Sequence, residues 1–268
     1  MSRHYYNLER DKKDDRDYKV SFEKAVKIST NMDLRSKLPE IFDQGELGSC
    51  TANAGVAARM VLNDIDTVLS RLFLYYKERE LEGTVSEDSG ASMRDICKAL
   101  NKYGVCEENF MPYNIDKFTD MPSEQALSNA VNYKIAAYKR LVSLNEIKRY
   151  IASNEQGVLM GISVYESFES DDVAATGKVP VPDIISEQYL GGHAIYVVGY
   201  KDETNNSMDK CLFRKWIMRF SKKANTAKSK GYLICRNSWG SEWGDKGYFY
   251  LPYEFVEEGF AYDFWVVE

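Results

Sequence analysis

The 268-residue sequence is poor in histidine and cysteine, with two histidines and five cysteines. An odd and low cysteine count does not indicate a disulfide framework, so free thiols in a reducing compartment are the simpler interpretation. Two histidines far apart and the lack of any C-x-x-C pair leave no zinc-binding spacing. We therefore expect neither a metal ion nor another cofactor.

Long apolar runs are also missing. No run reaches the ~18–20 residues that a membrane span needs, and residues 1–10 contain no apolar stretch typical of a secretory signal. We expect a protein of the cytoplasm or another reducing compartment that does not act at a membrane. The net charge of −6 argues against nucleic acid as the main partner.

Three regions of the chain differ in charge and in the pattern of apolar residues. Residues 1–32 are dominated by charge, which indicates a solvated or loosely held extension. Residues 33–130 show helical patterning, whereas residues 131–268 contain short apolar runs typical of strands. The helices are expected over residues 50–69, 70–81 and 92–102. The strands are expected over residues 158–164, 194–200, 231–237 and 247–251. Together these patterns predict an α+β fold of two lobes with a cleft between them.

One cysteine, Cys50, follows two turn-forming residues and opens a predicted helix. A helix N-terminus presents unpaired N–H groups that favour an anion, so it would lower the pKa of this thiol below ~8.5 and favour the reactive thiolate. A buried structural cysteine is the commoner alternative. That structural role is expected for the other four, Cys97, Cys106, Cys211 and Cys235.

A thiol nucleophile needs a base, and histidine is the usual one. His4 lies in the charged extension, where we expect it to be solvated, so His193 at the start of a predicted strand is the remaining candidate. A lone histidine at such a place is more often a hydrogen-bonded core residue. Its combination with Cys50 and with an orienting amide at Asn237 favours catalysis instead.

Three motifs resemble those of the papain-like cysteine peptidase family. They are Gln44 with Gly48-Ser49-Cys50, Gly192-His193-Ala194, and the nearly continuous run from Asn237 to Phe249. The last run is highly specific, and the separation of Cys50 from His193 lies within the ~130–150 residues expected of the family. The resemblance covers most of residues 33–268. Residues 43–54 resemble more closely a microbial branch without the usual long inhibitory propeptide.

The resemblance implies a papain-like fold and a cysteine endopeptidase whose substrate is a polypeptide. By it, the Cys50 thiolate and the His193 imidazolium form a pair, and the thiolate attacks a peptide carbonyl to give an acyl-enzyme. Asn237 would fix the tautomer of the imidazole, and Gln44 would stabilise the oxyanion.

The resemblance also implies which residues line the cleft. These are Ser89, Gly90, Gly161, Gly191, Gly192, Trp239 and Trp243. Trp239 would shield the histidine–asparagine bond from water, and Trp243 would shape the leaving-group side. Gly161 and Gly191 would line the pocket for the substrate residue two before the scissile bond. Because both lack side chains, we expect a roomy pocket that accepts large apolar or aromatic residues. The backbone of residues 89–91 could bind an extended substrate as an added strand, although an ordinary turn explains it equally well.

The sequence also departs from the family. Leu47 stands where the better-known secreted members carry a disulfide cysteine, and Thr51 replaces the aromatic residue that usually follows the nucleophile. Residues 201–230 look like an insertion rich in Lys, Arg and aromatic residues. A solvated hairpin explains the insertion better than a site for phosphate-rich partners.

Two questions stay open at this point. Residues 1–30 could cover the cleft as an autoinhibitory segment in cis, or they could form a disordered tail. The chain could also be a catalytically weak or inactive peptide-binding protein that kept the fold. The complete set of Cys50, His193, Asn237 and Gln44 weighs against this alternative, because binding alone would not need all four.

Overall fold

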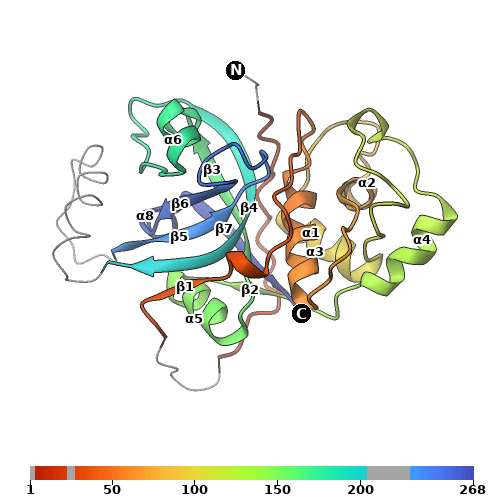
Figure 1. Cartoon of the computed structure of the whole chain (residues 1–268), viewed down its shortest axis with the longest axis horizontal. Coiled ribbons are helices and arrows are strands. Elements are labelled where there is room, and N and C mark those ends of the chain that lie inside the picture. Colours follow the sequence, from red (N-terminus) through yellow and green to blue (C-terminus); the bar gives the residue numbers. More distant parts are fainter. Residues whose placement is uncertain (1–3, 23–27, 204–229) are drawn as a thin grey trace.

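The computed structural model describes residues 4–22, 28–203 and 230–268. Two lobes lie side by side, one made of helices and the other built on a sheet (Figure 1). The helical lobe contains α1 (Cys50–Leu62), α2 (Arg71–Glu82), α3 (Met93–Lys102) and α4 (Glu124–Ala130). Short 3₁₀ turns lie at Arg35–Lys37, Ile115–Lys117, Val131–Tyr133 and Glu166–Glu169. The structure therefore has the two-lobed α+β architecture that the sequence predicts.

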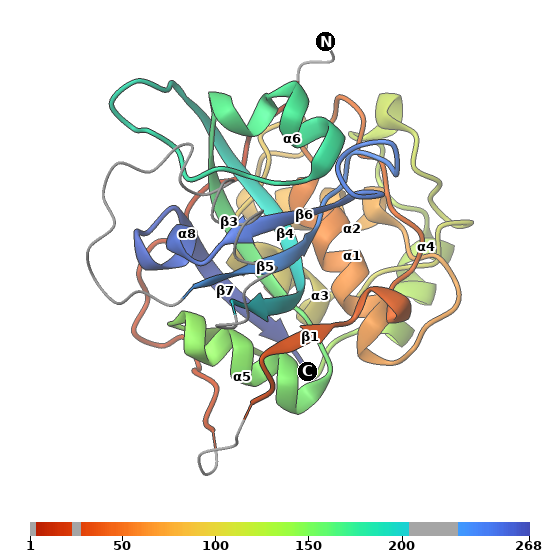
Figure 2. The same cartoon turned by 60° about the vertical axis from the view of Figure 1, so that its left-hand side comes forward.

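The second lobe is built on one antiparallel sheet. Its strands are β1 (Asn31–Asp33), β2 (Tyr138–Leu141), β3 (Val158–Tyr165), β4 (Tyr189–Asp202), β5 (Gly231–Arg236), β6 (Tyr248–Pro252) and β7 (Ala261–Val267). They follow the order β2-β7-β3-β4-β5-β6, and β1 pairs with β4 outside this path. The helices α5 (Leu144–Asn154), α6 (Asp171–Thr176) and α8 (Glu254–Glu257) lie around this sheet (Figure 2).

Five helices begin in the same way. The residue before α2, α3, α4, α5 and α6 is a serine whose side chain accepts the N–H of the third residue on, and these serines are Ser70, Ser92, Ser123, Ser143 and Ser170. Such caps satisfy backbone donors that the helix itself leaves unpaired. The first helix, α1, differs because Ser49 before it makes no such bond. The N–H groups at the start of α1 are therefore not occupied by a capping side chain.

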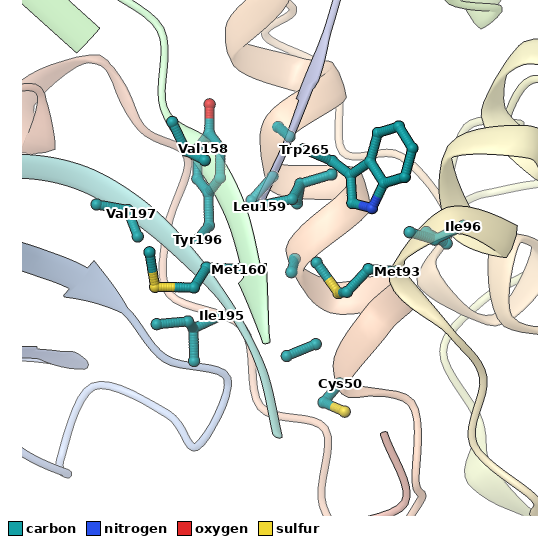
Figure 3. Packing of buried hydrophobic residues seen from close by; sticks show 14 of the residues in the cluster. Cys50, Met93, Ile96, Val158, Leu159, Met160, Ile195, Tyr196, Val197 and Trp265 are labelled. Atoms are coloured by element: carbon teal, nitrogen blue, oxygen red, sulfur yellow. The ribbon is translucent and has the colours of Figure 1, made fainter. Parts of the chain in front are cut away.

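The core lies where α1 and α3 pack against β3, β4 and β7 (Figure 3). Met93 and Ile96 from the helices meet Leu159 from the sheet there, beside the fully buried indole of Trp265. Cys50 stands at one edge of this packing, at the first turn of α1. The nucleophile candidate is thus held by a helix that is itself fixed between the two lobes.

The N-terminal segment is not a solvated extension over the residues that the structure describes, which corrects the expectation from its charge. Residues 4–20 run between the lobes and along β2 (Figure 1). Leu8 is buried, and backbone bonds join Val20 to Arg140 and Arg140 to Tyr18. His4 was expected to be solvated, but its ring stacks on Trp239 at a centroid distance of 3.8 Å. The aromatic and apolar side chains between the charges explain this packing.

The elements expected from the sequence are confirmed, with different bounds. The first helix ends at Leu62 and not at residue 69, and β4 begins at Tyr189, earlier than expected. Sequence analysis did not identify β2, β7, α4, α5 or α6. The insertion expected at 201–230 falls almost entirely outside the described residues. Within the described part of the chain, no helix combines the length and the apolar character that a membrane crossing requires.

Candidate active site

Cys50 is the first residue of α1 and is 1 % exposed. The helix packs against β4, which carries His193. Backbone N–H groups of Ala194 and Thr51 interact with the Cys50 thiol and oppose the rise of its pKa. Since Ala194 directly follows His193, the sulfur lies beside the imidazole's own stretch of β4. The helix N-terminus and the β4 strand therefore bring the predicted thiol and base together.

His193 and Asn237 form the clearest contact of the site. The Nε2 atom of His193 lies 2.8 Å from the Asn237 Oδ1 atom, and both side chains are buried. The pairing of β4 with β5 places them, because Asn237 follows the last residue of β5. The Nδ1 atom of His193 is buried and has no hydrogen-bond partner in the described chain. An imidazole fixed through one nitrogen, with the other unengaged, has the orientation that a general base needs.

Gln44 is tied to the same corner of the site. Its backbone N–H donates to the Ser238 carbonyl oxygen, and the Ser238 hydroxyl donates to the Gln44 Oε1 atom at 2.5 Å. The Gln44 Nε2 group donates to the Leu47 carbonyl oxygen at 3.0 Å, which uses one of its two N–H bonds. Because Ser238 orients the amide, the second Nε2 hydrogen is a possible oxyanion donor.

Aromatic rings cover the histidine. The Trp239 ring lies 5.1 Å from the His193 ring at a tilt of 31°. Trp243 packs edge-on against Trp239 at 4.9 Å, and Phe168 packs against both indoles. Trp239 is 7 % exposed. The two tryptophans thus pack together, and Trp239 lies beside the imidazole.

The N-terminal segment lies across this site. Its Leu8 N–H donates to the Gly192 carbonyl oxygen at 3.1 Å, and its Glu9 N–H donates to the Ala91 carbonyl oxygen at 3.3 Å. Tyr6 stands edge-on to the His193 ring at 6.0 Å and donates a hydrogen bond to Glu169. The segment therefore contacts both walls of the cleft and covers the imidazole.

The cleft glycines make room for this segment. A Cβ atom on Gly90 would lie 2.1 Å from the Asn7 carbonyl oxygen, and one on Gly191 would lie 2.5 Å from the Tyr6 carbonyl oxygen. Gly90 also has a φ of +73°, in the left-handed region that favours glycine. Both glycines thus let the backbone of the N-terminal segment approach closely.

The pocket beside Gly161 is less open than its glycines suggest. A Cβ atom on Gly161 would meet the Tyr262 ring at 2.6 Å and the Leu8 side chain at 2.8 Å. The Tyr262 hydroxyl also stands 2.6 Å from the place of a Gly192 Cβ atom and donates to the Ile162 carbonyl oxygen. The space left by the glycines is therefore filled by Tyr262 and by one leucine. Sequence analysis missed Tyr262, because its strand β7 was not recognised.

Burial sets the ionisation of the covered pair. Desolvation raises the pKa of the Cys50 thiol to about 12, and the N–H groups near it oppose this only in part. Desolvation also lowers the pKa of His193 to about 4, against the opposing effect of its bond to Asn237. The helix N-terminus was expected to lower the thiol pKa; in the covered site, the loss of water outweighs it. Burial thus disfavours the charged forms of both the thiol and the imidazole.

The other described cysteines are buried and free, in line with the structural role expected for them: Cys97, Cys106 and Cys235. Cys211 lies outside the described residues. Sequence analysis did not identify Ser238 as the partner of Gln44, although the residue stands inside the quoted asparagine motif. It also missed Tyr6 and Leu8, whose only sequence signal is that apolar residues interrupt a charged stretch.

Comparison with known proteins identifies the same architecture. Residues 28–258 match the family described as "Papain family cysteine protease". The chain is 36 % identical, over 96 % of its length, to an uncharacterized peptidase C1-like protein (L477) of Acanthamoeba polyphaga mimivirus. It is 33 % identical to the crystal structure of xylellain, a cysteine protease from Xylella fastidiosa, with a TM-score of 0.80 over 98 % of this chain and 95 % of that one.

More distant relatives are longer than this chain. It is 26 % identical to the viral cathepsin of Adoxophyes honmai nucleopolyhedrovirus over 83 % of its own length, but spans only 56 % of that protein. It spans 84 % of the mimivirus protein.

Proposed function

The chain belongs to the papain family of cysteine proteases, and we propose that Cys50, His193, Asn237 and Gln44 carry out its hydrolysis of peptide bonds. One observation supports these roles above the others. His193 is fixed by Asn237 at 2.8 Å, and its second ring nitrogen is left unengaged on the strand that touches Cys50. A protein that only bound peptides would not need this arrangement.

The reaction proceeds in two steps once water and substrate enter the cleft. The Cys50 thiol passes its proton to His193, and the resulting thiolate sulfur bonds to the substrate carbonyl carbon. The oxyanion that forms is held by the Gln44 amide and the Cys50 backbone N–H. The His193 imidazolium then protonates the leaving amine as the C–N bond breaks, which leaves a thioester. His193 next takes a proton from water, whose oxygen attacks the thioester and releases the acid and the Cys50 thiolate.

This assignment predicts selective labelling of one thiol. The epoxide inhibitor E-64 should alkylate Cys50 and stop cleavage of a fluorogenic peptide in proportion to the labelled fraction, because the same sulfur does both reactions. Peptide mapping by mass spectrometry locates the label. Cleavage that continues after complete labelling of Cys50 would contradict the assignment.

We propose further that the main pocket prefers a leucine-sized residue two positions before the scissile bond, in place of the large aromatic residues expected from the glycines alone. The support is that Tyr262 and the Leu8 side chain together fill the space beside Gly161. Leu8 thereby marks the size of side chain that fits next to Tyr262.

A peptide library should show this preference. We expect leucine to be selected over tryptophan at this position, by roughly tenfold in kcat/KM, since overfilling a packed pocket costs about 1–3 kcal/mol. Tyr262→Ala should reduce or reverse the preference, because it removes the ring that narrows the pocket. A native enzyme that prefers tryptophan, or a variant with unchanged selectivity, would show that Tyr262 does not set it.

We propose that residues 4–10 act in cis as an inhibitory segment. A substrate would place the residues before its scissile bond near Gly161 and those after it near Trp239. The segment places Leu8 near Gly161 and the earlier residue His4 on Trp239, so its chain runs opposite to a substrate. A reversed backbone fills the cleft without presenting a peptide bond as a substrate does, which favours inhibition over self-cleavage.

The segment is anchored behind the cleft by a cluster of charges. Asp11 accepts the Trp265 indole N–H at 2.7 Å, and Asp17 pairs with Arg94 at 2.8 Å and with Arg140 at 3.1 Å. The Asp11 carboxylate is fully buried. Removing all of residues 1–30 would therefore take from Arg94 its partner Asp17 and leave Arg140 with its partner Asp263, which weakens the charge network. Substitutions in residues 4–10 change the covering part and leave this anchor in place.

A further inference from the structure

The loop that carries the substrate-facing Gly90 has little structure of its own. Residues 83–91, between α2 and α3, contain no helix or strand. Two residues one turn apart on α2 hold it. Arg79, fully buried, donates to the Val85 carbonyl oxygen at 2.7 Å and to the Glu87 carbonyl oxygen at 2.9 Å. Tyr75, also fully buried, holds the end of the loop at Gly90.

The Tyr75 hydroxyl joins two parts of this loop. It donates to the Asp88 carboxylate and accepts the Gly90 N–H at 3.1 Å. The Asp88 carboxylate in turn accepts the Gly48 N–H, with both carboxylate oxygens at 3.0 Å. Gly48 stands two residues before Cys50 in the turn that leads into α1. One continuous chain of hydrogen bonds thus runs from the nucleophile turn to Gly90. We call it the Tyr75–Asp88 brace.

A peptide already lies on the surface that this brace supports. The Asn7 side chain donates to the Asp88 carbonyl oxygen at 3.0 Å, and the Asn7 carbonyl oxygen packs on Gly90. The next contact along is the bond from Glu9 to the Ala91 carbonyl oxygen. The residues beside the brace therefore bind backbone, and the N-terminal segment stands in for an extended peptide there.

We propose that Tyr75 and Asp88 are positioning residues for peptide hydrolysis: they fix the loop at Gly90, to which a substrate binds, relative to the Cys50 turn. The proposal rests on the proposed role of Cys50 as the nucleophile. Neither residue touches the reacting atoms. Each acts through a backbone N–H group of the helical lobe, Tyr75 through that of Gly90 and Asp88 through that of Gly48. A glycine with a left-handed φ in a loop without secondary structure would otherwise sample many conformations, and a substrate would have to order it on binding.

The two ends of the brace can be separated by substitution. Tyr75→Phe removes the hydroxyl that holds Gly90 and leaves the bond between Asp88 and Gly48. Asp88→Asn keeps the size of the side chain but replaces one of the two carboxylate oxygens that accept the Gly48 N–H by an NH₂ group. The bond to Gly48 is weakened, because one uncharged oxygen must then serve both Gly48 and Tyr75. Tyr150→Phe is the matched control, because Tyr150 on α5 is also buried, at 2 % exposed, and its hydroxyl donates to the Gln156 side chain in the other lobe.

The experiment uses the full chain, with Leu8→Asn added to every variant so that the segment does not mask the cleft, and repeats each measurement without Leu8→Asn. We expect Tyr75→Phe to raise KM for a peptide that reaches Gly90 by about tenfold, the effect of one lost hydrogen bond. Its kcat and its rate of Cys50 alkylation by iodoacetamide should stay within about threefold, because this reagent does not use Gly90. Asp88→Asn should in addition lower kcat and slow the alkylation. Tyr150→Phe should change none of these values.

Amide hydrogen exchange gives an independent readout of the same bonds. The Gly90 amide should exchange faster in Tyr75→Phe, where the exchange of the Gly48 amide should not change. The Gly48 amide should exchange faster in Asp88→Asn. An active parent whose KM is unaffected by Tyr75→Phe would overturn the brace alone. So would a loss of activity that merely follows a lowered Tm in all three variants. A parent that hydrolyses no peptide would refute the proposed function, and the brace with it.

Discussion

Cys50→Ala should abolish peptide hydrolysis, with kcat/KM lower by at least about 10⁴-fold. The reason is chemical, since the alanine methyl group cannot form the acyl-enzyme and the remaining groups only bind and polarise the substrate. The measurement is cleavage of a fluorogenic peptide, with the limit of detection set by enzyme concentration. Folding should be retained, because the change removes a single sulfur atom at the edge of the core.

Cys97→Ala is the matched control for this substitution. Cys97 is as buried as Cys50 but sits in the middle of α3, away from the cleft. It should lower stability slightly and leave kcat/KM unchanged. If Cys50→Ala kept a rate close to that of the Cys97→Ala control, another group would have to be the nucleophile, and the proposed mechanism would be wrong.

Leu8→Asn should raise the peptidase activity of the full chain by roughly a hundredfold or more. The leucine contributes about 1.5–3 kcal/mol to closure by burial, and an unpaired amide in the same place costs about 1–3 kcal/mol. Their sum weakens closure by about 2.5–6 kcal/mol, where 1.4 kcal/mol corresponds to a factor of ten. The asparagine is chosen over aspartate because Arg10 lies nearby, over the Tyr262 ring.

The same change at an exposed leucine is the control for this prediction. Leu127 on α4 is 38 % exposed and lies outside the cleft, so Leu127→Asn should leave the activity as it is. The comparison is made on kcat/KM with a single peptide substrate. Equal activity of the native chain and Leu8→Asn would contradict the proposal that residues 4–10 inhibit the peptidase.

The residues of the candidate site are easier to predict from the sequence than the burial of that site. Cys50, His193 and Asn237 are recognisable because each stands in a local motif, next to glycines or at the start of a helix. Their meeting in space follows from the pairing of β4 with β5 and from α1 packing on β4. Strand alternation and helix-start signals indicate these elements one at a time, so the two-lobed fold could also be predicted.

Burial across the cleft could not be predicted in the same way. The sequence of residues 4–8 does not itself show that they pack on Trp239 and Gly192, because these contacts depend on residues far away in the chain. The pKa of Cys50 was likewise expected to fall with the helix N-terminus, whereas burial of the thiol raises it. The sequence analysis did not identify Tyr262 as a pocket residue, because it did not identify β7. The glycines alone therefore predicted a larger pocket than the structure has.

The Tyr75–Asp88 brace illustrates a further limit. Tyr75, Asp88 and Gly90 follow Gly48 in the chain by 27, 40 and 42 residues. The bonds also involve backbone N–H groups, which no side-chain motif marks. Leu47 shows only that a disulfide cysteine is missing beside the nucleophile turn. The structure shows that the Asp88 carboxylate holds that turn by accepting the Gly48 N–H.

The rate at which iodoacetamide alkylates Cys50 in the full chain tests most directly whether this thiol is the nucleophile and is closed off by its own N-terminal segment. Alkylation is followed at neutral pH by mapping the Cys50 peptide, in the native chain, Leu8→Asn and Leu127→Asn. We predict slow alkylation in the native chain and in Leu127→Asn, and a rate roughly a hundredfold higher in Leu8→Asn. Equally fast alkylation in all three, or none in Leu8→Asn, would contradict this account.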